Sequence, residues 1–169
     1  LAAIYNTSVF DGIYGLRNTR QDSYDSAELA LRQNFGGQYE WMASYTRSRA
    51  RSTAVLDHSI DQIVRTTDNF GPLPWDSPNR LLSWGFLPVG FKNWSAAYLF
   101  ETRSGFPFSV QRDNGQVLGA VNSHRLPMYF DLNLHAERRF RFRSNLLAVR
   151  GGFNNITNHK NYSLANNIF

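Results

Sequence analysis

Six stretches of this sequence alternate apolar and polar residues with a period of two, and each is about as long as a strand that crosses a bilayer. In residues 24–34, for example, one side carries Ala27, Leu29 and Leu31, and the other carries Ser26, Glu28, Ala30, Arg32 and Asn34. Because successive side chains of a strand point to opposite faces, each stretch has one apolar and one polar face. The sequence therefore predicts an all-β protein with an antiparallel sheet of about six to seven strands.

The other five stretches repeat the pattern with different residues. Their predicted apolar sides are Trp41, Ala43 and Tyr45; Leu82, Trp84 and Phe86; Ala96, Tyr98 and Phe100; Met128, Phe130, Leu132, Leu134 and Ala136; and Leu147, Val149, Gly151 and Phe153.

The connections between these stretches alternate between short and long. Short turns fall at Gly36 and Gly37, at residues 89–93 and near Arg141, whereas residues 52–79 and 109–126 are expected to be long loops. Transmembrane barrels have short periplasmic turns and long extracellular loops, so this sorting favours an up-and-down barrel segment in the cell outer membrane. Aromatic residues flank the short turns, where a periplasmic girdle is expected: Phe35, Tyr39, Trp41, Phe86, Phe91, Trp94, Phe140 and Phe142.

Composition narrows the classes that remain. No apolar run is long enough for a transmembrane helix, and the absence of cysteine excludes disulfides and thiolate catalysis. The net charge of +5 is spread along the chain rather than gathered into a basic patch, so we do not expect nucleic-acid binding. Arg138, Arg139, Arg141 and Arg143 are expected to be solvated around a turn. Six strands are too few to close a membrane barrel, and the chain begins with Leu1, so we expect residues 1–169 to be part of a larger barrel.

Several motifs, in this order, resemble the C-terminal part of the barrel of a TonB-dependent outer-membrane receptor, of the type with a carboxypeptidase-regulatory-like domain. They begin at Tyr24 (YDSAEL), Tyr45 (YTRS), Pro78 (PNRL), Ser104 (SGFPFS), Tyr129 (YFDLNL) and Gly152 (GFNNITN). The resemblance implies a barrel of about 22 strands that is filled by an N-terminal plug and imports scarce nutrients. It also implies contact with the receptor's own plug and with TonB through N-terminal parts. No plug is present here, and the chain ends at Phe169, where the family has a loop before its final strand.

The polar sides of the predicted strands hold the candidate lumen-facing residues. These are Glu28, Arg32, Glu40, Glu101, Asp131, His135, Glu137 and Arg150. Charges of both signs suit a water-filled or plugged interior, and we expect most of these side chains to pair with each other or with the plug. Asp57, His58, Asp61 and Asp68 follow no metal-binding spacing, and neither do His124, His135 and His159, so we expect no metal and no cofactor. No catalytic motif is present, and we do not expect an enzyme.

Three arginines continue the apolar side of the second stretch. Arg47, Arg49 and Arg51 share the parity of Trp41 and Tyr45 but lie beyond Tyr45, where an outer aromatic girdle is expected. Guanidinium groups there suit the phosphates of lipopolysaccharide, although arginines on a strand that rises above the bilayer would simply be solvated.

Three functions fit these features. The first is a fragment of a TonB-dependent transporter for a nutrient such as a carbohydrate or a siderophore. The alternatives are a passive porin and a secreted β-sandwich that binds a carbohydrate through exposed aromatics. The sequence does not identify a ligand. It leaves open whether residues 1–21 contain a further strand through Ala3, Tyr5 and Val9, followed by an outer loop over residues 11–21, because Gly12 and Gly15 weaken that pattern.

Overall fold

The computed structural model describes residues 18, 20–36, 39–56, 66, 68–87 and 89–163. Its long elements are antiparallel strands: β1 (Asp22–Asn34), β2 (Glu40–Ser52), β4 (Asn79–Leu87), β5 (Trp94–Arg103), β10 (Tyr129–Phe142) and β11 (Asn145–Phe153). The short elements are β3 (Gly71–Pro72), β6 (Pro107–Phe108), β7 (Val110–Gln111), β8 (Val117–Leu118) and β9 (His124–Arg125). No described residue is helical, so the predicted all-β fold is confirmed.

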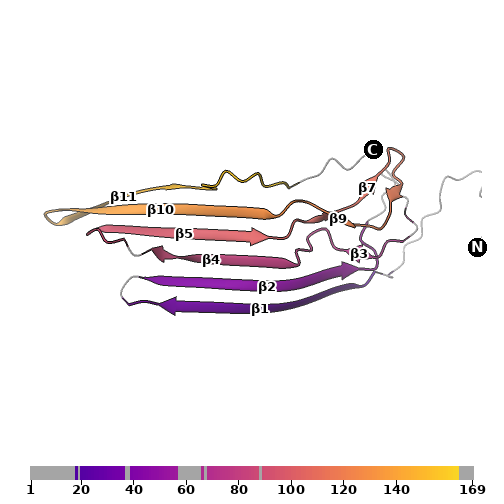
Figure 1. The fold of residues 1–169 in the computed structure, drawn as a ribbon, viewed down its shortest axis with the longest axis horizontal. Helices are drawn as coiled ribbons and strands as arrows, with labels where there is room; N and C mark the ends of the chain where they lie inside the picture. Colours follow the sequence, from indigo (N-terminus) through magenta and orange to yellow (C-terminus); the bar gives the residue numbers. More distant parts are fainter. Residues whose placement is uncertain are drawn as a thin grey trace, which may run out of the picture.

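The six long strands form one meandering sheet in chain order (Figure 1), and β3 extends it by pairing with β2. β1 and β11 are its edges, and no other described strand pairs with them. The described strands thus form an open sheet.

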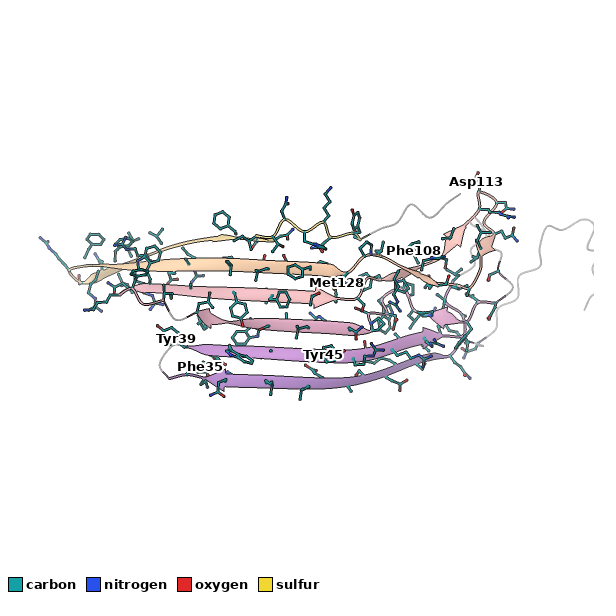
Figure 2. All side chains as sticks on the ribbon, viewed as in Figure 1. Phe35, Tyr39, Tyr45, Phe108, Asp113 and Met128 are labelled. Atoms are coloured by element: carbon teal, nitrogen blue, oxygen red, sulfur yellow. The ribbon has the colours of Figure 1, made fainter. Side chains whose placement is uncertain are left out.

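The connections are sorted between the two ends of this sheet (Figure 1). At the short-turn end lie the β1–β2, β4–β5 and β10–β11 connections, and at the long-loop end lie the β2–β4 and β5–β10 connections. Figure 2 shows Phe35 and Tyr39 at the short-turn end and Asp113 at the tip of the long-loop end. The last hairpin turns later than predicted: Phe142 still pairs with Asn145, and Arg143, at a φ of 52°, begins the turn that was expected near Arg141.

The register of the sheet defines two faces, because residues paired across antiparallel strands point the same way. The apolar face consists of odd-numbered residues of β1, β2, β4 and β11 and even-numbered residues of β5 and β10; the polar face consists of the rest. One row across the apolar face, for example, is Gln33, Trp41, Gly85, Tyr98, Leu134 and Phe153. The predicted apolar sides of β1, β2, β5, β10 and β11 all belong to the apolar face.

Strand β4 is the exception, and its predicted orientation is wrong. Trp84 pairs with Met42 and Leu99, and Leu82 pairs with Ser44, so Leu82, Trp84 and Phe86 lie on the polar face. Phe86 therefore does not join Trp94 in a girdle on one face. The apolar side of β4 holds Leu81, Ser83, Gly85 and Leu87 instead. Gly85 is required there, because a Cβ atom at this position would lie 2.7 Å from the Cβ of Trp41.

The two long connections pack together at the long-loop end. The carboxylate of Asp76, only 3% exposed, accepts a hydrogen bond of 2.6 Å from the backbone N–H of Ala50 and forms an ion pair with Arg125. Arg125 also donates to the carbonyls of Asp76 and Gly105, at 2.9 and 3.1 Å. The side-chain amide of Asn122 donates to the carbonyl of Pro72 at 2.8 Å. These bonds join residues 69–78 to residues 104–127, and we call the two segments together the loop cap.

Replacing Asp76 with Ala should loosen the loop cap. The substitution leaves the amide of Ala50 without its acceptor and the guanidinium of Arg125 without its carboxylate partner, and the loss of such charge-assisted bonds costs about 2 kcal/mol. Amide hydrogen exchange at Ala50 and proteolysis within residues 104–127 should both become faster. Asp113→Ala, at the exposed tip of the same loop, is the control and should leave both rates unchanged.

Candidate functional site

The register gathers the eight candidate lumen-facing residues onto the polar face. Glu28 and Arg32 come from β1, Glu40 from β2, Glu101 from β5, Asp131, His135 and Glu137 from β10, and Arg150 from β11. Every long strand except β4 therefore contributes at least one of these residues to the polar face.

Two of the acidic residues on this face are paired with arginines from neighbouring strands. Arg32 and Glu40 form an ion pair across the first hairpin. Glu101 accepts from Arg80 Nε at 2.9 Å, and Arg103 Nε lies 3.9 Å away. The sequence missed Arg80 as a partner, because the parity assigned to β4 pointed this residue to the opposite face.

Glu137 is the centre of a second cluster on the polar face. It accepts from Arg139 at 2.8 Å and from Arg150 at 2.7 Å, and its own side chain is only 12% exposed. Nearby, the amide of Asn133 donates to Asp131 at 2.8 Å. The side chains of Glu28 and His135, in contrast, form no hydrogen bond or ion pair with another described residue, and they are available to a ligand or to another protein segment.

The polar face also carries an apolar patch, which we call the β4–β5 patch. It consists of Met42, Leu82, Trp84, Phe86 and Leu99. Phe86 and Leu99 are 46% and 41% exposed. The patch lies among charged residues and no described segment covers it. Its side chains can leave water only if another protein surface packs against them.

The apolar face does not pack against a second described sheet, and it is most exposed on the edge strands β1 and β11. Leu29, Leu31, Leu147, Val149 and Phe153 each expose more than half of their surface. The buried apolar residues lie instead at the long-loop end, where Val55, Val117 and Val121 form a small cluster. The core of the described chain is therefore in the loops, and the sheet contributes two open faces.

The three arginines on β2 lie at the long-loop end of the apolar face. Arg47 and the hydroxyl of Tyr45 both donate to Asn79 Oδ1, at 2.6 and 2.8 Å. The Arg51 guanidinium stacks over Phe70 at 5.3 Å. Arg49 is opposite Asp25 in the register but forms no ion pair with a described residue. A groove of about 540 Å³ runs past all three arginines, between Ala27 and Pro78.

The remaining sequence candidates do not assemble into a site within the described ranges. Asp57, His58 and Asp61 lie outside them, and the carboxylate of Asp68 accepts from the amide of Phe70 at 2.9 Å. His124 packs on Phe108, and His159 packs on Phe130. No group of potential metal ligands occurs among the described residues.

Comparison with protein-family models, with curated proteins and with solved structures finds no match to this chain. None of the described residues belongs to a helix long and apolar enough to span a membrane.

Proposed function

We propose that this chain forms part of the wall of an outer-membrane β-barrel, and that the barrel belongs to a TonB-dependent receptor that imports a nutrient such as a carbohydrate or a siderophore. The observation that carries the proposal is the difference between the two faces of the sheet. One face gathers the apolar sides of β1, β2, β5, β10 and β11 and does not pack against a second described sheet, and the other bears cross-strand ion pairs. A barrel wall needs this division, with lipid outside and a polar interior.

The height of the apolar face supports a membrane-spanning wall. On β10 this face runs from Phe130 to Phe140 and carries one charge, Arg138, near its short-turn limit. The run is about 34 Å along the strand at 3.4 Å per residue. With the strand tilt of about 40° found in membrane barrels, this length spans about 26 Å, close to the usual apolar band of about 25 Å. Aromatic residues stand at both limits, as in barrels whose band is flanked by girdles.

The stagger of the hairpins supports closure into a larger barrel. Leu134, Tyr98, Gly85 and Trp41 share one row, and the β1–β2 hairpin ends one residue beyond it, at the pair Asn34–Glu40. The β10–β11 hairpin continues to Phe142, eight residues beyond Leu134, and protrudes in Figure 1. The β4–β5 pairing ends between these two, two residues beyond the row, at Leu87–Ala96. A shift in one direction across the sheet tilts the strands relative to the barrel axis, which closing a sheet requires.

The β4–β5 patch favours a plugged receptor over a passive porin. Trp84, Phe86 and Leu99 would face water in an open channel, at a cost that a porin lumen avoids. A plug domain packed against the wall would cover them, while Glu28 and His135 remain available for polar contacts to it.

The charge distribution disfavours the carbohydrate-binding β-sandwich. In a sandwich the apolar face would pack against a second sheet. Such packing would bury Arg138 between the two sheets and place Arg47 and Arg49 at the edge of their interface. Burying an arginine without an acidic partner costs free energy.

In the proposed wall, Arg47, Arg49 and Arg51 lie at the outer surface of the membrane, at the level of the lipopolysaccharide phosphates. Arg47 is held by Asn79 and Arg51 by Phe70, so the planar groups are fixed in position. Arg49 lies between them with its donors unused by any described acid. This arrangement suits the phosphates of lipopolysaccharide, and the apolar face below it suits the acyl chains.

A charge on the apolar face tests the wall directly. In the full-length protein inserted in lipid vesicles, Leu31→Arg should cost about 2–4 kcal/mol of folding free energy, because the guanidinium would face hydrocarbon. Ala30→Arg, one residue away on the polar face, should change it by no more than about 0.5 kcal/mol. Equal, small effects of the two substitutions would mean that the face is in water and would overturn the proposed wall.

Conductance separates the receptor from a porin. The full-length protein in a planar lipid bilayer should show no steady open channel, because a plug covers the β4–β5 patch. Steady, ohmic conductance would assign the chain to a passive porin, although the wall itself would remain.

Removing the Arg49 charge tests the lipopolysaccharide contact. Arg49→Gln should reduce the lipid A that copurifies with the full-length protein, by up to about tenfold for one lost charge-assisted contact. The Arg49 side chain forms no hydrogen bond or ion pair with another described residue, so the fold should persist. Arg141→Gln, which lies at the opposite end of the sheet and on the polar face, is the matched control. Unchanged lipid A in Arg49→Gln would rule out the contact.

A further inference from the structure

A groove crosses the apolar face near the short-turn end, because three small residues lie side by side there. Ala96 pairs with Ala136, and Ala136 pairs with Gly151, so the floor of the groove spans β5, β10 and β11. Larger side chains stand on both sides of this floor. They are Trp94 and Val149 toward the short turns and Leu134, Phe153 and Ile156 toward the long loops. The groove measures about 800 Å³, and its lining is almost entirely apolar.

One charged side chain borders the groove. Arg138 pairs with Trp94 and Val149 across the sheet, and its guanidinium lies 5.4 Å from the Trp94 ring and 4.7 Å from the Phe140 ring. No acidic residue of the described chain forms an ion pair with it. Glu137, its neighbour in sequence, points to the other face and is already paired with Arg139 and Arg150.

We propose that this groove binds one anionic phospholipid of the membrane, with the lipid phosphate on Arg138 and an acyl chain over Ala96, Ala136 and Gly151. The inference rests on the proposed membrane wall. The inference adds a specific lipid site near the short-turn end of the sheet, whereas the β2 arginines lie at the long-loop end.

The two parts of the site match the two parts of such a lipid. The rings of Trp94 and Phe140 hold the guanidinium by its face, which leaves its N–H donors free at the edge for phosphate oxygens. The small floor residues let an acyl chain lie closer to the backbone than on the surrounding surface. Trp94 is also the type of residue that marks the interface of a bilayer, where the phosphates are found.

A phospholipid fits this groove better than a protein segment does. The groove opens onto the uncovered apolar face, which in the proposed wall contacts hydrocarbon on all sides. A protein partner would need a carboxylate at Arg138 and apolar residues at the floor, within a surface that otherwise faces lipid.

Lipid retention measures the site. The full-length protein and two variants are reconstituted with dioleoylphosphatidylglycerol, extracted into mild detergent, and analysed by native mass spectrometry for bound lipid. Arg138→Gln removes the charge, and Ala136→Leu fills the floor. Each should weaken retention of the probe lipid, by about tenfold for Arg138→Gln. Arg141→Gln, exposed on the other face of the same strand, should retain the lipid as the unchanged protein does.

The outcomes separate this inference from the proposed function. Normal vesicle insertion with equal retention in all proteins would overturn the lipid site and leave the wall intact. Failure of the unchanged protein to insert would overturn both. A change in oligomeric state for Arg138→Gln, without a change in lipid retention, would assign the groove to a second copy of the chain and overturn the lipid assignment. Because Arg138 is exposed, Arg138→Gln should fold even if Ala136→Leu does not.

Discussion

The antiparallel register between neighbouring strands is the interaction on which the rest of this structure depends. Side chains alternate with a period of two, so a shift of one residue between two strands would exchange their faces. The observed register places Glu137 opposite Arg150 and Leu82 opposite Glu101, and it brings Ala96, Ala136 and Gly151 into one row. The ion pairs of the polar face and the groove of the apolar face are both consequences of this pairing.

Some of this arrangement could be predicted from the sequence, because several strands alternate strongly. In β10 apart from Arg138, and in residues 27–32 of β1 apart from Ala30, polar and apolar residues alternate, so the faces of these strands are unambiguous. Strand β4 has Leu81 beside Leu82 and Phe86 beside Leu87, and its faces are decided only by pairing with β2 and β5. The wrong orientation of β4 also concealed Arg80 as a partner of Glu101 and Trp84 as part of the β4–β5 patch.

Long-range contacts explain what else the sequence did not reveal. Asp76 and Arg125 lie in different loops, and nothing in their local sequence indicates that they meet. Arg138 is exposed, as expected, but β10 continues to Phe142 and places this residue in a strand between two aromatic rings instead of at a turn. Its parity with Phe140 was a usable signal, since an arginine on the apolar side of a strand is unusual.

The charges of the long strands divide between the faces in a way that bears on the proposed membrane placement. The polar face carries six acidic and six basic residues: Asp22, Glu28, Glu40, Glu101, Asp131 and Glu137, and Arg32, Arg80, Arg103, Arg139, Arg141 and Arg150. The apolar face carries Arg47, Arg49, Arg51 and Arg138 against Asp25 alone. Its arginines stand toward the two ends, with only uncharged residues between them. A face that is apolar in the middle and cationic toward both limits complements a bilayer with anionic phosphates on each side, whereas a face buried against a second protein sheet gains nothing from unpaired cations.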